Sequence, residues 1–102
     1  MLDKLMAAQG MANEVKKRLD TITVFGEVED GAIKISANGN KVITAIDINE
    51  DFLKEIDKEG LEELLQTAIN KALAQADQVN AAEMQAATKD MLGGFGNLFG
   101  NS

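Results

Sequence analysis

The amino-acid sequence predicts an α+β domain: a helix, a three-stranded antiparallel meander, a short helix and a long C-terminal helix, in that order. Two dipeptides, Asp30-Gly31 and Asn38-Gly39, are typical of tight hairpin turns because their residues tolerate positive φ angles. Branched apolar residues alternate with other residues over 21–48, as they do in strands. The flanking segments have helical apolar spacing, and the chain contains no proline.

Residues 2–20 are expected to form the first helix. Its apolar stripe is Leu2, Leu5, Ala12, Val15 and Leu19, widened by Met6 and Ala8. The last turn holds Lys16, Lys17 and Arg18, whose charges favour the negative end of the helix dipole. Two interpretations of this basic group stay open: it stabilises the helix terminus, or it contacts phosphates.

Two-residue turns would fix the register of the meander by pairing Val28 with Ile33 and Ile35 with Val42. That register places most branched residues on one face: Ile22, Val24, Val28, Ile33, Ile35, Ala37, Val42, Ile46 and Ile48. The opposite face is mixed, with Glu27 beside Lys34 across the first hairpin. Phe25, Ile43 and Ala45 lie on this second face, which is either solvated or used by a second subunit.

The segment after the meander is predicted to be helical. Asn49 suits the N-cap of a short acidic helix, and a long helix is expected from about residue 61 to 90, ending at Gly93-Gly94. Its predicted seam is Leu61, Leu65, Ala68, Ala72, Gln75, Val79, Ala82 and Ala86. Thirty helical residues span about 45 Å, whereas a compact domain of this size is about 30 Å across. Part of the helix must therefore project and pack on the first helix of the same chain or of a symmetry mate.

The composition argues against catalysis, metal binding and cofactor binding. The 102 residues include no Cys and no His, which removes the usual zinc and haem ligands and the commonest general base. No catalytic residue, metal ligand or cofactor is therefore predicted. No apolar run is long enough to span a bilayer, and the N-terminal residues lack the apolar core of a signal peptide, so a cytoplasmic location is expected.

The division of the chain is predicted to be one domain over residues 1–92, followed by a flexible Gly/Phe tail over residues 93–102. The net charge of −7 is concentrated in one block. Residues 49–63 carry a balance of −5, whereas residues 1–20 carry +1. Such an acidic protein is a poor partner for DNA unless its basic groups are segregated.

The order of elements, together with the phrase Gly31-Ala-Ile-Lys-Ile-Ser-Ala-Asn-Gly-Asn40, followed by Val42 and by Ile46-Asp-Ile48, resembles the YbaB/EbfC family of bacterial nucleoid-associated proteins. The resemblance spans residues 2–86. It departs from the family at the strand-helix junction, where Asn49 and Glu50 replace the usual proline. The resemblance implies a tweezer-like homodimer that binds duplex DNA in the nucleoid through its projecting helices.

In the projecting helices, the charge-based candidates for DNA contact are Lys4, Lys16, Lys17, Arg18, Lys71 and Lys89. The candidates for the dimer interface are Phe25, Ile43, Ala45 and Val79. The alternative function is an acidic interaction module that has kept the dimeric scaffold without strong DNA binding. Its acidic helix, or its Phe-containing tail, would then meet a protein partner.

Overall fold

The computed structural model describes the backbone of residues 2–99 and the side chains of residue 10 and residues 12–89. The elements are α1 (Leu2–Thr21), β1 (Thr23–Val28), η1 (Glu29–Gly31), β2 (Ile33–Asn38), β3 (Ile43–Ile48), α2 (Glu50–Glu55) and α3 (Lys58–Phe99). This order confirms the predicted α+β fold. The strands form one antiparallel sheet in the order β1-β2-β3.

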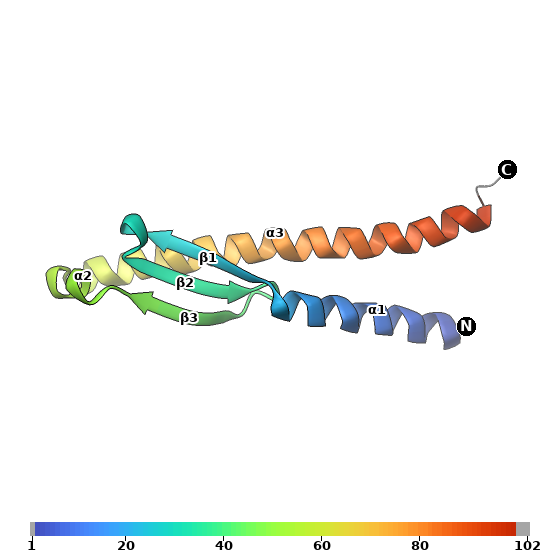
Figure 1. Cartoon of the computed structure of the whole chain (residues 1–102), viewed down its shortest axis with the longest axis horizontal. Coiled ribbons are helices and arrows are strands. Elements are labelled where there is room, and N and C mark those ends of the chain that lie inside the picture. Colours follow the sequence, from blue (N-terminus) through green and yellow to red (C-terminus); the bar gives the residue numbers. More distant parts are fainter. Residues whose placement is uncertain (1, 100–102) are drawn as a thin grey trace.

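The molecule is elongated, measuring 67 × 26 × 18 Å, and α3 runs along its long axis (Figure 1). The N-terminal half of α3 lies along the sheet, and its C-terminal half projects beyond the sheet in the same direction as α1 (Figure 1). We call these two projecting segments the arms. At about 1.5 Å per residue, the 42-residue helix α3 spans about 63 Å, so a sheet of six-residue strands cannot cover its whole length.

The first hairpin has the predicted register. Val28 pairs with Ile33, and Glu27 pairs with Lys34. The turn residues Asp30 and Gly31 have φ angles of 55° and 88°, and the Ala32 amide donates to the Glu29 carbonyl oxygen over 3.0 Å. Both positive φ angles are those of a type I′ turn, so local turn chemistry sets this pairing.

The second hairpin differs from the prediction. Ile35 pairs with Ile46 instead of Val42, and a bulge between Ser36 and Ala37 shifts the register again. The connection is longer than two residues because the Asn38 side chain accepts hydrogen bonds from the amides of Asn40 and Val42 and so builds a wider turn. The predicted pairing across Asn38-Gly39 is therefore wrong by four residues on β3.

Gly39 is needed for close approach and not for a positive φ angle. A Cβ atom at this position would lie 2.7 Å from Leu19 Cδ2 and 2.9 Å from the Leu19 carbonyl oxygen. The Gly39 amide donates to that same carbonyl oxygen over 2.9 Å. Gly39 thus joins the second turn to the end of α1, and it is Lys41, with φ of 65°, that takes the left-handed conformation.

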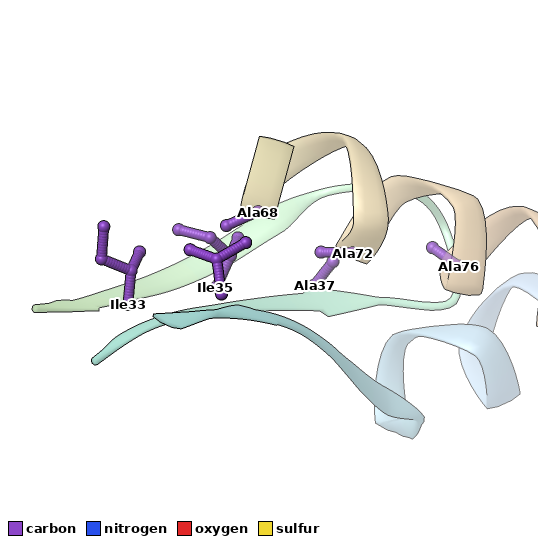
Figure 2. Close-up of a cluster of buried hydrophobic side chains, with 7 residues drawn as sticks. Ile33, Ile35, Ala37, Ala68, Ala72 and Ala76 are labelled. Atoms are coloured by element: carbon purple, nitrogen blue, oxygen red, sulfur yellow. The ribbon is translucent and has the colours of Figure 1, made fainter. Parts of the chain in front are cut away.

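The core lies between the sheet and α3. Ile33, Ile35 and Ala37 of β2 face Ala68, Ala72 and Ala76 of α3 (Figure 2), and all six are fully buried. The three alanines are four residues apart and so share one helix face. The predicted seam was therefore right at Ala68 and Ala72 but wrong at Gln75, which is exposed and whose expected place is taken by Ala76.

The bulge also changes which β3 residues reach the core. Ile43 pairs with Ala37 and packs against the core, so its predicted place on the opposite face is wrong. Val42, predicted on the core face, is 53% exposed. An inserted residue reverses the side-chain alternation that precedes it, which accounts for both exchanges.

The helices begin and end close to their predicted positions, with one exception. Asn49 caps α2 by accepting a hydrogen bond from the Phe52 amide over 3.0 Å, as predicted. By contrast, α3 continues to Phe99 through Gly93-Gly94, so the predicted helix end is wrong. Phe95 and Phe99 lie outside the residues whose side chains are described, and the flexibility of the tail stays a prediction.

Candidate nucleic-acid interface

The net negative charge of the molecule comes from the sheet end. Residues 23–63, which form the sheet, α2 and the start of α3, carry eleven acidic and four basic side chains, a balance of −7. Residues 1–22 and 64–102 carry six of each, so the helical part of the chain is neutral. Because repulsion from a polyanion falls with distance and with screening by salt, the arms are the least unfavourable place for DNA to approach.

The last turns of α1 present three of the predicted residues together. Lys16, Lys17 and Arg18 are all exposed. The second turn caps this helix end: Asn40 Nδ2 donates to the Lys16 carbonyl oxygen over 2.9 Å and also to the Asp20 carboxylate. These bonds tie the second turn to the last turns of α1, and they fix the basic segment against the turn.

The second turn brings a fourth base to this position. Lys41 lies in the same turn as Asn40 and reaches α3, where its Nζ is 3.0 Å from Asp77 Oδ1. We call the group of Lys16, Lys17, Arg18 and Lys41 the basic junction. Sequence reasoning missed Lys41 because a two-residue turn would have placed it on a strand. The usable signal was its place directly after the asparagine-rich turn Asn38-Gly39-Asn40.

Three residues of α3 face the basic junction. Asp77 pairs with Lys41, Asn80 Nδ2 donates to the Gly39 carbonyl oxygen over 3.1 Å, and Glu83 Oε2 lies 3.4 Å from Arg18 Nε. Residues three apart on a helix form a continuous ridge, so this contact line is one surface feature, which we call the α3 ridge. In the part of the chain that is described, α1 therefore packs on α3 of its own chain, with Val15 and Leu19 buried.

The remaining DNA-contact candidates are not gathered at the junction. Lys71 Nζ donates to the Glu27 carbonyl oxygen over 3.3 Å, beside β1. Lys89 is exposed on the distal arm of α3, and at about 1.5 Å per residue it lies about 27 Å along the helix from Lys71. The side chain of Lys4 lies outside the described residues. Among the described candidates, Lys16, Lys17, Arg18 and Lys89 lie on the arms and Lys71 lies beside the sheet, so they do not form one compact patch.

The dimer-interface candidates differ in their surroundings. Phe25 is 46% exposed, and Lys34 Nζ lies 4.2 Å from the centre of its ring. Ala45 is exposed, Val79 is half-buried, and Ile43 packs on the core as described above. These placements leave Phe25 and Ala45 as exposed apolar groups on the sheet face opposite α3.

The apolar side chain that most clearly lacks cover is on β3. Ile46 is the cross-strand partner of Ile35 and shares its face, yet Ile35 is fully buried and Ile46 is 53% exposed. The contacts of α3 are mainly with β1 and β2, and the edge strand β3 is left largely uncovered. Val42, before β3, and Leu53, in α2, are also about half-exposed.

Two further properties concern the described residues alone. They contain no group of three or more acidic side chains arranged to hold a metal ion. None of their helices combines the length and the apolar character that crossing a bilayer requires.

Comparison with known proteins gives a consistent result. The model of the YbaB/EbfC DNA-binding family matches residues 1–91. A nucleoid-associated protein of Flavobacterium johnsoniae is 36% identical, covering 97% of this chain and 94% of that protein. One from Thermus thermophilus is 37% identical, over 98% and 92% respectively. The fold also resembles the crystal structure of an uncharacterized protein from Helicobacter pylori, with a TM-score of 0.60 and 18% identity over 72% of this chain and 86% of the other.

Proposed function

The chain belongs to the YbaB/EbfC DNA-binding family, and on this basis we propose that it is a nucleoid-associated protein that binds duplex DNA without catalysing a reaction. Its place would be the bacterial nucleoid, and its role the organisation of DNA or the regulation of genes. Besides family membership, the main observation that supports the proposal is the segregation of charge within the molecule. The sheet end holds the whole excess of negative charge, and the arms hold exposed bases.

Binding would rest on the DNA backbone. Lys16 and Lys17 are exposed, and neither ammonium group forms a hydrogen bond or an ion pair with the described residues. Lysine side chains contact phosphates as point charges and carry no sequence information, so we expect weak sequence preference. Lys71 and Lys89 would extend the contact along α3.

The test is a salt series. A labelled duplex is titrated with the wild type and with the Lys16→Gln/Lys17→Gln variant at several salt concentrations. Each phosphate contact contributes about 0.9 to the slope of log affinity against log salt, so the variant is expected to bind more weakly with a slope shallower by about 2 per protomer. A matched Lys54→Gln/Lys58→Gln variant, at the acidic end, should keep the wild-type slope. Absence of binding at low salt would reject the function, and equal slopes for all three proteins would reject the residues.

We further propose that two copies associate through the uncovered edge of the sheet. Ile46 is exposed beside the buried Ile35, so the core is not covered at this point. A second copy that covered Ile46 would remove apolar surface from water, which stabilises the pair by about 25 cal/mol per Å² of buried surface. The alternative interface is the opposite sheet face, which holds Phe25 and Ala45 of the four sequence-predicted interface residues. A symmetric pair would present two sets of arms, which doubles the phosphate contacts.

Sedimentation equilibrium distinguishes the two surfaces. Ile46→Asp and Ala45→Asp place the same charge on opposite faces of one strand. If the interface is the uncovered edge, the wild type sediments as a dimer, Ile46→Asp as a monomer and Ala45→Asp as a dimer. If the opposite face is used, the two variants exchange their behaviour. A wild type that sediments as a monomer contradicts both.

A second candidate function is supported by the acidic end itself. Leu53 is 46% exposed among the acids of α2, which suits a protein partner with basic and apolar groups. Under this alternative the chain is an interaction module. Co-purified protein that survives nuclease treatment, and that is lost in Leu53→Asp but kept in Lys16→Gln/Lys17→Gln, would favour it.

A further inference from the structure

Two of the four bases in the basic junction are already occupied by acids of the same chain. Lys41 Nζ lies 3.0 Å from Asp77 Oδ1, and Arg18 Nε lies 3.4 Å from Glu83 Oε2. Lys16 and Lys17 directly precede Arg18 in sequence and are exposed. The junction is therefore a mixed site, in which carboxylates from α3 sit where phosphate oxygens would have to bind.

The arrangement is built by the fold. Asn80, between the two acids on the α3 ridge, donates to the Gly39 carbonyl oxygen, and Gly39 is in turn bonded to the Leu19 carbonyl oxygen. The turn is thus held between α1 and α3 by backbone-directed bonds that do not involve either ion pair. Breaking the ion pairs leaves this framework in place, so the bases can change partner without the arms separating.

The ion pairs are exposed enough to be exchanged. The side chains of Lys41 and Asp77 are 48% and 68% exposed, and those of Arg18 and Glu83 are 55% and 29% exposed. Exposed ion pairs contribute little net free energy, because water and salt compete for both partners. A DNA phosphate has an advantage over a lone carboxylate, since binding to it also releases counterions condensed on the duplex.

We propose that Asp77 and Glu83 are stand-ins for phosphate that mask Lys41 and Arg18 until DNA displaces them, and that Lys41 is a further DNA-contacting residue. This inference rests on the proposed DNA-binding function. It gives the α3 ridge a regulatory role: binding requires the exchange of two internal ion pairs, which sets a weaker affinity than four open bases would give. The binding of isolated anions is thereby disfavoured relative to the binding of a polyanion.

The masking has a specific signature in double variants. Asp77→Asn removes the acid and frees Lys41, so we expect duplex binding at low salt to tighten by about two- to fivefold, the range equivalent to an exposed ion pair. Glu83→Gln should act in the same way through Arg18. Lys41→Gln should cancel the gain of Asp77→Asn, because the freed base is then absent.

A matched control separates masking from general charge. Glu62→Gln also removes one negative charge and breaks an exposed ion pair, with Lys58 at 3.5 Å, but at the acidic end of the molecule. Affinity for a labelled duplex is measured by fluorescence anisotropy for the wild type, Asp77→Asn, Asp77→Asn/Lys41→Gln, Glu83→Gln and Glu62→Gln. Circular dichroism confirms that each protein keeps the wild-type fold and thermal midpoint.

The outcomes are distinguishable. Tighter binding by Asp77→Asn than by Glu62→Gln, lost again with Lys41→Gln, supports the masking. Binding by Asp77→Asn with none by the wild type overturns the exchange, because DNA must be able to displace the acids in the wild-type protein. Equal binding by Asp77→Asn and Glu62→Gln, or a gain that survives Lys41→Gln, overturns the masking and leaves the proposed function standing. Absence of binding by every protein overturns both.

Discussion

Replacing Gly26 by alanine tests how closely α3 packs on the sheet. A Cβ atom at Gly26 would lie 2.5 Å from the Ala72 nitrogen and closer still to the Ala68 carbonyl oxygen. Both are backbone atoms of α3, so no side-chain rotation relieves the overlap. Ordinary carbon contacts begin at about 3.5 Å, and α3 would therefore have to move away from β1 by about 1 Å.

The cost follows from what that movement separates. Ala68 and Ala72 are fully buried against Ile35, and small side chains make contact only while the backbones stay close. Overpacking of a close-packed core costs about 1–3 kcal/mol, and the absence of a flexible neighbour places this site at the upper end, about 3 kcal/mol. For a domain of about 100 residues, each 1 kcal/mol lowers the thermal midpoint by about 4–8 °C, so we expect a fall of about 12–24 °C.

The assay is thermal and urea unfolding followed by circular dichroism, with all proteins at equal concentration. Gly10→Ala is the matched control, because a Cβ atom at Gly10 meets nothing within 4 Å. Alanine in a helix interior is favoured over glycine by about 1 kcal/mol, so this control should be slightly more stable than the wild type. A Gly26→Ala variant that unfolds at the wild-type midpoint would refute the close packing of α3 on β1.

Three smaller perturbations test other contacts. Ile35→Ala, at a fully buried position, should destabilise the protein by about 2–5 kcal/mol in urea unfolding, whereas Ser36→Ala on the other sheet face should cost far less. Asn40→Ala removes the side-chain bond to the Lys16 carbonyl oxygen and should cost about 1 kcal/mol, with faster hydrogen exchange in the last turn of α1; unchanged exchange there would contradict the capping role. Asn49→Ala removes the α2 cap and should also cost about 1 kcal/mol, with loss of protection at the Phe52 amide, and retained protection would show that the cap is dispensable.

The sequence allowed the first hairpin to be predicted but not the second. The register at Asp30-Gly31 depends on positive φ angles at these two residues, and the Asp-Gly dipeptide itself indicates this conformation. Gly39 looks the same in sequence, but its role depends on Leu19, a residue from another element that the turn packs against. A close approach of this kind is a tertiary property, and strand alternation reveals neither this approach nor the bulge at Ser36/Ala37.

The candidate site was predictable only where it depends on residues adjacent in sequence, and not where it depends on tertiary contacts. Lys16, Lys17 and Arg18 are adjacent in sequence and therefore visible as a group. Lys41 joins them only because the second turn folds back on α1, and the acids that occupy Arg18 and Lys41 come from α3. Counts of charge showed that the bases were few. Only the fold shows that two of them are paired and that the negative excess lies at the other end.

The central claim is that duplex DNA meets the arms and the basic junction while the acidic end stays free. An NMR titration of the labelled protein with a short duplex tests this directly, residue by residue. We expect the largest amide shift changes in residues 14–20, 39–42 and 77–89, and small changes in residues 47–63. The largest changes in residues 47–63, or no change at low salt, would contradict the account.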